Sequence, residues 1–100
     1  MRIVKRTSTS RAVANLYISD NNIALLLLTY NTDTETGQYS ALLYSWVPDD
    51  YRPKKSIRAA ASQADNGNIY PAQIITSGSV QTLKAIPANV TETIIATWPF

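Results

Sequence analysis

One hundred residues, of which 45% are hydrophobic and 16% charged, are typical of one folded domain with a real core. The chain contains no cysteine and no histidine, which excludes disulfides, zinc–thiolate sites and thiol nucleophiles and removes the commonest general base. With seven carboxylates and a formal net charge of +2, neither an enzyme nor a nucleic-acid-binding protein is expected, and no metal or other cofactor is expected.

Basic residues form two groups, which we interpret as solvated segments because a nucleic-acid surface would be richer in basic residues and interleaved with aromatic ones. The groups are Arg2, Lys5, Arg6 and Arg11, and then Arg52, Lys54, Lys55 and Arg58. Residues 1–100 are expected to form a single domain, in which residues 1–10 are an N-terminal arm.

The apolar run from Ile23 to Leu28 is far shorter than the ~20 residues that span a bilayer, so membrane insertion is not expected. The polar residues that precede this run also make it a poor export signal. A chain without cysteine and without such a signal is expected to be made and folded in a cytoplasm.

In chain order, residues 11–19 are the first predicted strand, since their apolar and polar side chains alternate. The apolar face consists of Ala12, Ala14, Leu16 and Ile18. Asp and Asn at positions 20–22 are typical of a turn, and residues 23–32 follow as a second strand. After the polar loop "DTETGQ", residues 39–47 are a third strand, so residues 23–47 are predicted to form a hairpin with a long tip.

Four further strands are predicted in the second half of the chain, at residues 56–64, 69–76, 80–86 and 90–98. The Asn66-Gly67 pair is a strong signal for a two-residue hairpin turn. The segment "RAAASQA" also has helix propensity, which is the alternative at this place. About seven to eight short strands, roughly ten residues apart, predict an all-β fold, an antiparallel β-sandwich or jelly-roll-like barrel.

The segment "IALLLL", residues 23–28, is apolar at both alternating positions, so neither face of this strand is expected to meet water. A further sheet layer, a loop or another copy of the chain has to cover the second face. Oligomerisation is the expected solution, because one hundred residues leave little chain for an extra layer.

In the stretch "WVPDDYRPKKSI", residues 46–57, two prolines flank a short segment that contains both acidic and basic residues. Pro48 and Pro53 fix φ at both ends, so the residues between them are held in place. Tyr51 can pack its ring over a strand end, and Arg52 can bind a neighbouring aspartate or a strand carbonyl. We therefore interpret the stretch first as a stiff connection that sets strand exit and register, and second as a ligand-binding loop.

This stretch resembles the C-terminal receptor-binding head domain of tail-fibre and baseplate proteins from phages that infect Gram-positive bacteria. In that family a strand ends in Leu or Val, Pro, two small or polar residues, an aromatic residue, Arg and Pro, and further strands with a Gly turn follow. The matching positions are Val47, Pro48, Asp49, Asp50, Tyr51, Arg52, Pro53 and Ile57, then Asn66-Gly67, "IYPAQIITSGSV" with Gly78, and the terminal "IIATWPF". The resemblance runs from about Asn15 to the end of the chain, with Asp50 at a position where glycine is common.

The resemblance implies a homotrimeric β-sandwich head of a virion, which binds a host cell-surface saccharide and contacts other tail or baseplate proteins. Since the anchoring segments of such proteins are not seen in this sequence, we expect either the C-terminal head of a longer protein or a free-standing relative. The alternative is a structural tail or fibre-tip module that trimerises without binding sugar. A small hydrolase acting on wall glycans is a third hypothesis, and no catalytic residue is assigned.

A saccharide site needs an aromatic ring for the C–H face of the sugar and polar groups for its hydroxyls. Tyr44 and Trp46 share one face of their predicted strand and point outward if Leu43 points into the core. Packing in the core or at a subunit contact is the commoner fate of a lone Trp. The candidate site residues are Tyr44, Trp46, Asp49, Asp50, Tyr51, Arg52 and Asp65. Adjacent carboxylates diverge along an extended chain, so the Asp pair predicts neither a calcium loop nor a glycosidase pair.

Overall fold

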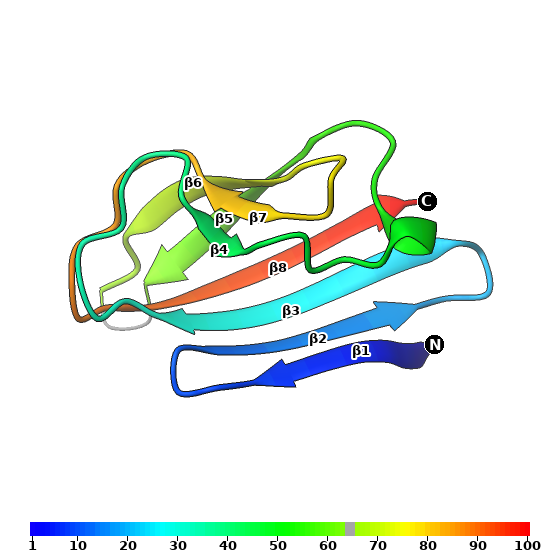
Figure 1. Cartoon of the computed structure of the whole chain (residues 1–100), viewed down its shortest axis with the longest axis horizontal. Helices are drawn as coiled ribbons and strands as arrows, with labels where there is room; N and C mark the ends of the chain where they lie inside the picture. Colours follow the sequence, from blue (N-terminus) through cyan, green and yellow to red (C-terminus); the bar gives the residue numbers. More distant parts are fainter. Residues whose placement is uncertain (64–65) are drawn as a thin grey trace.

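The computed structural model describes residues 1–63 and 66–100, and it confirms the all-β class predicted from the sequence. Eight antiparallel strands form one sheet in the order β1-β2-β3-β8-β5-β6-β7-β4, and this sheet curls into a half-barrel (Figure 1). The strands are β1 (Arg2–Ser8), β2 (Ala12–Ile18), β3 (Ile23–Asn31), β4 (Ala41–Leu43), β5 (Ile57–Gln63), β6 (Ile69–Ile74), β7 (Val80–Thr82) and β8 (Thr91–Pro99). A short 3-10 turn, η1 (Asp49–Tyr51), lies between β4 and β5. No helix in the described part of the chain is long and apolar enough to cross a membrane.

Strands β2, β3 and β8 form the central part of the sheet and pair with continuous register. The alternation predicted for residues 11–19 is confirmed, because Ala14 and Leu16 of β2 are fully buried. The same face of the sheet buries Leu26 of β3 and Ile94 of β8. Removing this apolar surface from water stabilises the fold by roughly 25 cal/mol for each Å².

Residues 2–8 form the edge strand β1, in place of the N-terminal arm expected over residues 1–10. β1 pairs antiparallel with β2. Its side chains are mostly exposed or half-buried, and its basic residues are of the kind that protects a sheet edge from further pairing. Because an edge strand of this kind lacks a clear apolar face, the sequence carries little strand signal there.

The curl of the sheet brings β1 next to the segment that follows β4. The indole Nε1–H of Trp46 donates to Oγ1 of Thr7 at 2.7 Å. The ammonium Nζ of Lys5 donates to the main-chain O of Trp46 at 2.6 Å and lies 5.0 Å from the centre of the Trp46 ring, a cation–π contact. One tryptophan therefore joins the two edges of the sheet.

The predicted hairpin of residues 23–47 is wrong, because β3 and β4 do not pair. β3 is already paired on both sides, by β2 and by β8. β4 pairs with β7 at the far end of the sheet order. The connection from β3 to β4 runs beside the connection from β7 to β8 (Figure 1), and Thr36 and Ile86 form a bridge between them. Pairing between residues distant in the chain thus decides the path of this segment.

Strands β5 and β6 form the hairpin predicted in the second half of the chain. Residues 57–63 are extended as β5, so the strand interpretation is confirmed there and the helix alternative is wrong. Gly67 has a positive φ of 72°, as expected for a turn. The N–H of Gln63 donates to the O of Asn68, so the connection between the two strands is longer than the two residues Asn66-Gly67 expected from the sequence.

The central strands also present side chains on the side of the sheet that faces away from the core, which we call the outer face. Ile23, Leu25 and Leu27 of β3 lie there and are half-buried. Leu27 pairs across the strands with Ile95 of β8, whose side chain is 63% exposed. These four residues form the outer apolar strip. Since all described strands belong to one sheet, no second sheet layer of the described chain covers the strip.

Candidate functional site

The stretch between β4 and β5, residues 44–56, forms a corner at the end of the molecule where β8 finishes (Figure 1). The chain enters the corner through Ser45, whose φ of 45° breaks the strand alternation. The amide N–H groups of Trp46 and Val47 both donate to the main-chain O of Gly78 at 3.0 Å. The corner is therefore hydrogen-bonded to the turn between β6 and β7.

Arg52 holds the corner together from inside. Its Nε donates to the main-chain O of Val47 at 2.8 Å, and its Nη1 pairs with Oδ1 of Asp49 at 2.8 Å. Gly78 lies against the same groups, since a Cβ there would come within 2.6 Å of both Arg52 Nε and Val47 O. The predicted contact of Arg52 with an aspartate is thus present, whereas the carbonyl that it binds belongs to the corner itself and not to a neighbouring strand.

The end of β8 supports the corner from the other side. The indole Nε1–H of Trp98 donates to the main-chain O of Tyr51 at 2.7 Å. The rings of Tyr51 and Phe100 meet edge to face with their centres 5.1 Å apart, a favourable arrangement for aromatic rings. The N–H of Phe100 donates to the O of Asn22 at 3.0 Å, which fixes Phe100 between the corner and the β2–β3 turn.

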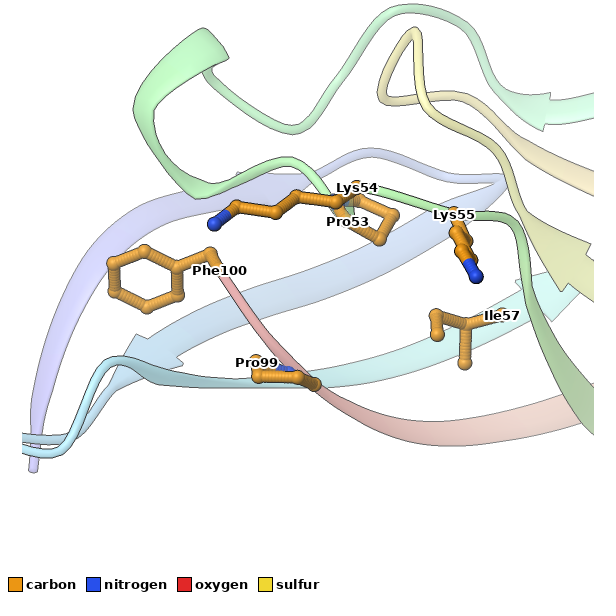
Figure 2. A pocket seen from close by; sticks show the side chains of 6 residues that line it. All are labelled: Pro53, Lys54, Lys55, Ile57, Pro99 and Phe100. Atoms are coloured by element: carbon orange, nitrogen blue, oxygen red, sulfur yellow. The ribbon is translucent and has the colours of Figure 1, made fainter.

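A pocket of about 340 Å³ lies between the corner and the end of β8, and its volume falls at the lower end of the range of small-ligand sites. Its lining residues are Pro53, Lys54, Lys55, Ile57, Pro99 and Phe100. Figure 2 shows the Lys54 side chain on the Phe100 side of the pocket and the Lys55 side chain on the Ile57 side. The pocket therefore combines flat apolar surfaces with two positive charges.

The two aromatic residues predicted for the site lie in different environments. The Trp46 side chain is only 7% exposed and is bonded to Thr7, so the outward orientation considered for it is wrong and its packing alternative is present. Tyr44 is 84% exposed and turned away from the core. The positive φ of Ser45 between them turns the chain, so strand alternation no longer places both rings on one face.

The other predicted site residues that the structure describes are spread over the corner and do not line the pocket. Asp49 is bound to Arg52, and Asp50 is exposed. Tyr51 is half-buried and supports the pocket through its contact with Phe100. Asp65 lies outside the described residues.

Sequence reasoning missed the residues that line the pocket. Lys54 and Lys55 belong to a basic group interpreted from the sequence as solvated, and Phe100 is not among the aromatic candidates. A signal for the lysines exists, because they follow Pro53 directly in the stiff corner. No local pattern indicates that Phe100, far along the chain, meets the same corner.

No group of acidic, His or Cys side chains in the described part of the chain is suited to hold a metal ion. No model of a known protein family matches this sequence, and a search of curated proteins finds no match to it. The function of the pocket therefore has to be inferred from the chemistry of the residues around it.

A second unusual feature is Glu92, which faces the core at the start of β8 and is not part of the pocket. Its side chain is 0% exposed, and neither carboxylate oxygen has a hydrogen-bond partner among the described residues. Its cross-strand neighbours are Tyr30 and Gln63. Burial raises the pKa of Glu92 from 4.5 to about 7, because the charged form loses water without gaining a partner.

Proposed function

We propose that the protein is the receptor-binding module of a phage tail or baseplate, which attaches the virion to a saccharide of the host cell surface without catalysing a reaction. The main observation in support of this proposal is that the corner lies directly beside the pocket. Residues 47–53 bear the resemblance to phage receptor-binding heads, and they lead directly into the pocket wall at Pro53 and Lys54. A stiff corner beside a pocket lined by rings is suited to hold a sugar.

The side chains around the pocket have the chemistry that a saccharide requires. Phe100, Pro53 and Pro99 offer apolar surfaces on which the C–H face of a sugar ring can lie. Lys54 and Lys55 can donate hydrogen bonds to its oxygen atoms. A single small site of this kind binds weakly, because few groups contribute to it.

Several copies of the chain are proposed to act together as a homotrimer joined to other tail or baseplate proteins. The outer apolar strip is a surface that a second copy can cover. Joining weak sites in one assembly raises the overall avidity by about 10²- to 10⁴-fold without any new contact. Weak sugar sites repeated by symmetry are therefore sufficient for firm adhesion.

A second candidate is a structural tail or fibre-tip module that trimerises and binds no sugar. This candidate is favoured because polar side chains in the corner bind other groups of the protein and are not free for a sugar. Arg52 is bound to Asp49 and Val47, and the Trp46 indole is bound to Thr7. In this role the pocket and the exposed Tyr44 would contact neighbouring tail proteins.

Retention of the purified protein on cell walls tests the two candidates. The labelled protein is incubated with a panel of purified Gram-positive cell walls, and the walls are sedimented beside a control protein of similar size and charge. Adhesion predicts retention on at least one wall and release by glycan fragments prepared from that wall. Retention on none of the walls, at concentrations where the protein is oligomeric, would contradict adhesion and favour the structural module.

A further inference from the structure

We infer that the pocket beside the corner takes a saccharide that carries an anionic group, a phosphate or a carboxylate. This ligand class rests on the proposed saccharide-binding function and makes it more specific. Two features of the pocket lead to it: the balance of charge around the corner, and the fixed positions of the rings that line the pocket.

The positive charges of the corner differ in how they are compensated. Arg52 is paired with Asp49 at 2.8 Å, so its charge is compensated within the protein. Lys54 and Lys55 form no salt bridge with a carboxylate of the described residues, and the lining contains no acidic side chain. Figure 2 shows the two lysine side chains on different sides of the pocket, so an anionic group that enters it can pair with an ammonium group that has no carboxylate beside it in the lining. Lysine binds phosphate well as a point charge.

The remaining lining of the pocket is apolar. Pro53, Ile57, Pro99 and Phe100 supply rings and a branched aliphatic chain. A bare inorganic anion would contact the ammonium groups and leave these surfaces open to water. A sugar with an anionic substituent covers the rings with its C–H face and brings its charge to the lysines, so it uses both parts of the pocket.

The walls of the pocket are in place before a ligand binds. Phe100 is held by the edge contact with Tyr51 and by its N–H bond to the O of Asn22. Pro53 and Pro99 have φ values fixed by their rings. Pre-positioned walls lower the entropy that binding costs, so among the lining residues the lysine side chains are the ones that a ligand still has to order.

Titration with glucose 6-phosphate, followed by amide chemical shifts, tests the pocket directly. We expect the shifts to gather on the amides of residues 54–57 and of Phe100. The affinity is expected to be roughly tenfold or more above that of glucose and to decrease in added salt. Glucuronic acid distinguishes a carboxylate from a phosphate, and inorganic phosphate measures the contribution of the charge alone. Equal affinity for glucose and glucose 6-phosphate, or shifts elsewhere in the protein, would overturn the inference.

A double variant, Lys54→Gln with Lys55→Gln, removes both charges from exposed positions where the fold does not depend on them. It is expected to bind glucose 6-phosphate at least about tenfold more weakly than the wild type. Lys84→Gln is the matched control, an exposed lysine outside the pocket, and it is expected to bind as the wild type does. Wild-type affinity in the double variant would overturn the inference.

Different experimental results would contradict the proposed function and the inferred ligand class. If cell walls retain the wild type and the double variant equally, adhesion stands and the anionic pocket is overturned. If walls retain neither protein, adhesion fails, and the titration with glucose 6-phosphate still decides whether the pocket takes an anionic sugar.

Discussion

Glu92 couples the stability of the protein to pH, because its buried carboxyl has no hydrogen-bond partner among the described residues. In the folded protein its pKa of about 7 keeps the carboxyl protonated up to neutral pH, whereas the ordinary pKa of 4.5 applies to the unfolded chain. The stability that depends on this proton is therefore complete below pH 4.5 and is lost as the pH rises to about 7. The loss is on the order of 3 kcal/mol, since each pKa unit corresponds to about 1.4 kcal/mol.

Replacing Glu92 by Gln removes this dependence, since an amide of the same shape does not ionise. We expect wild type and Glu92→Gln to have similar free energies of unfolding near pH 4.5. At pH 8 the variant should be more stable by on the order of 3 kcal/mol. Urea unfolding of both proteins across this pH range measures the difference between their free energies of unfolding. The other carboxylates titrate alike in the two proteins, so their contribution cancels in this difference. Parallel pH profiles of the two proteins would show that Glu92 is not the cause.

Single residues differ in how far the sequence predicts their environment. The alternation in "VTETIIATW" places Glu92 in line with Ile94 and Trp98, so its position on the core face can be derived from the sequence. The opposite fates of Tyr44 and Trp46 cannot, because they depend on the positive φ of Ser45. A serine carries no strong preference for that conformation.

At the scale of elements, the corner and the β6–β7 turn are locked together through Gly78. Gly78→Ala would place a Cβ 2.6 Å from Arg52 Nε and Val47 O, at a residue whose φ is 87°. We expect a loss of about 2 to 4 kcal/mol in the free energy of unfolding, since neither the backbone nor the bound Arg52 can move freely. Thermal or urea unfolding measures it, and the amide shifts of Trp46 and Val47 report the local displacement.

Gly67→Ala is the matched control for this prediction. Gly67 also has a positive φ, of 72°, but a Cβ there would meet no atom of the described residues within 4 Å. Its expected cost is the backbone strain alone, about 1 kcal/mol. Equal losses in the two variants would mean that the close approach at Gly78 contributes nothing.

Among the strands, predictability follows burial on one face. β2, β3 and β8 are recognised in sequence because each buries alternate residues in the core. The edge strand β1 lacks such a pattern and is not predicted. β4 and β7 are three residues long, so the strands predicted over residues 39–47 and 80–86 extend too far. The corner was predictable as a stiff connection, since two prolines and an Arg beside Asp residues limit a chain wherever it lies.

For the whole molecule, the open outer face is the property that bears on assembly. Strands lie about 4.8 Å apart and rise about 3.3 Å per residue. The five strands in the order β1-β2-β3-β8-β5, of which β3 has nine residues, thus span at most about 700 Å². Each partner in a standard protein interface buries about 800 Å². The outer face is therefore large enough for a stable contact with a second copy, with the apolar strip at its centre.

Ile95→Lys tests whether copies associate through this face. Ile95 is 63% exposed, so a lysine there costs the folded monomer little but places a charge in the proposed contact. We expect light scattering to give a mass near three times 11.0 kDa for the wild type and close to 11.0 kDa for Ile95→Lys. Tyr39→Lys, at a side chain 59% exposed outside the strip, should keep the wild-type mass. A wild type that stays monomeric at every concentration would contradict the trimer.

The all-β class, the central strands, the stiffness of the corner and the two-sided apolar character of residues 23–28 can be derived from the amino-acid sequence. These properties depend on the spacing of apolar side chains and on the φ limits of proline, which act over a few neighbouring residues. The folded structure is needed to see that β4 pairs with β7, that Trp46 is buried against β1, and that Lys54 and Phe100 line one pocket. Each of these depends on contacts between residues far apart in the chain, and the curl of the whole sheet brings such residues together.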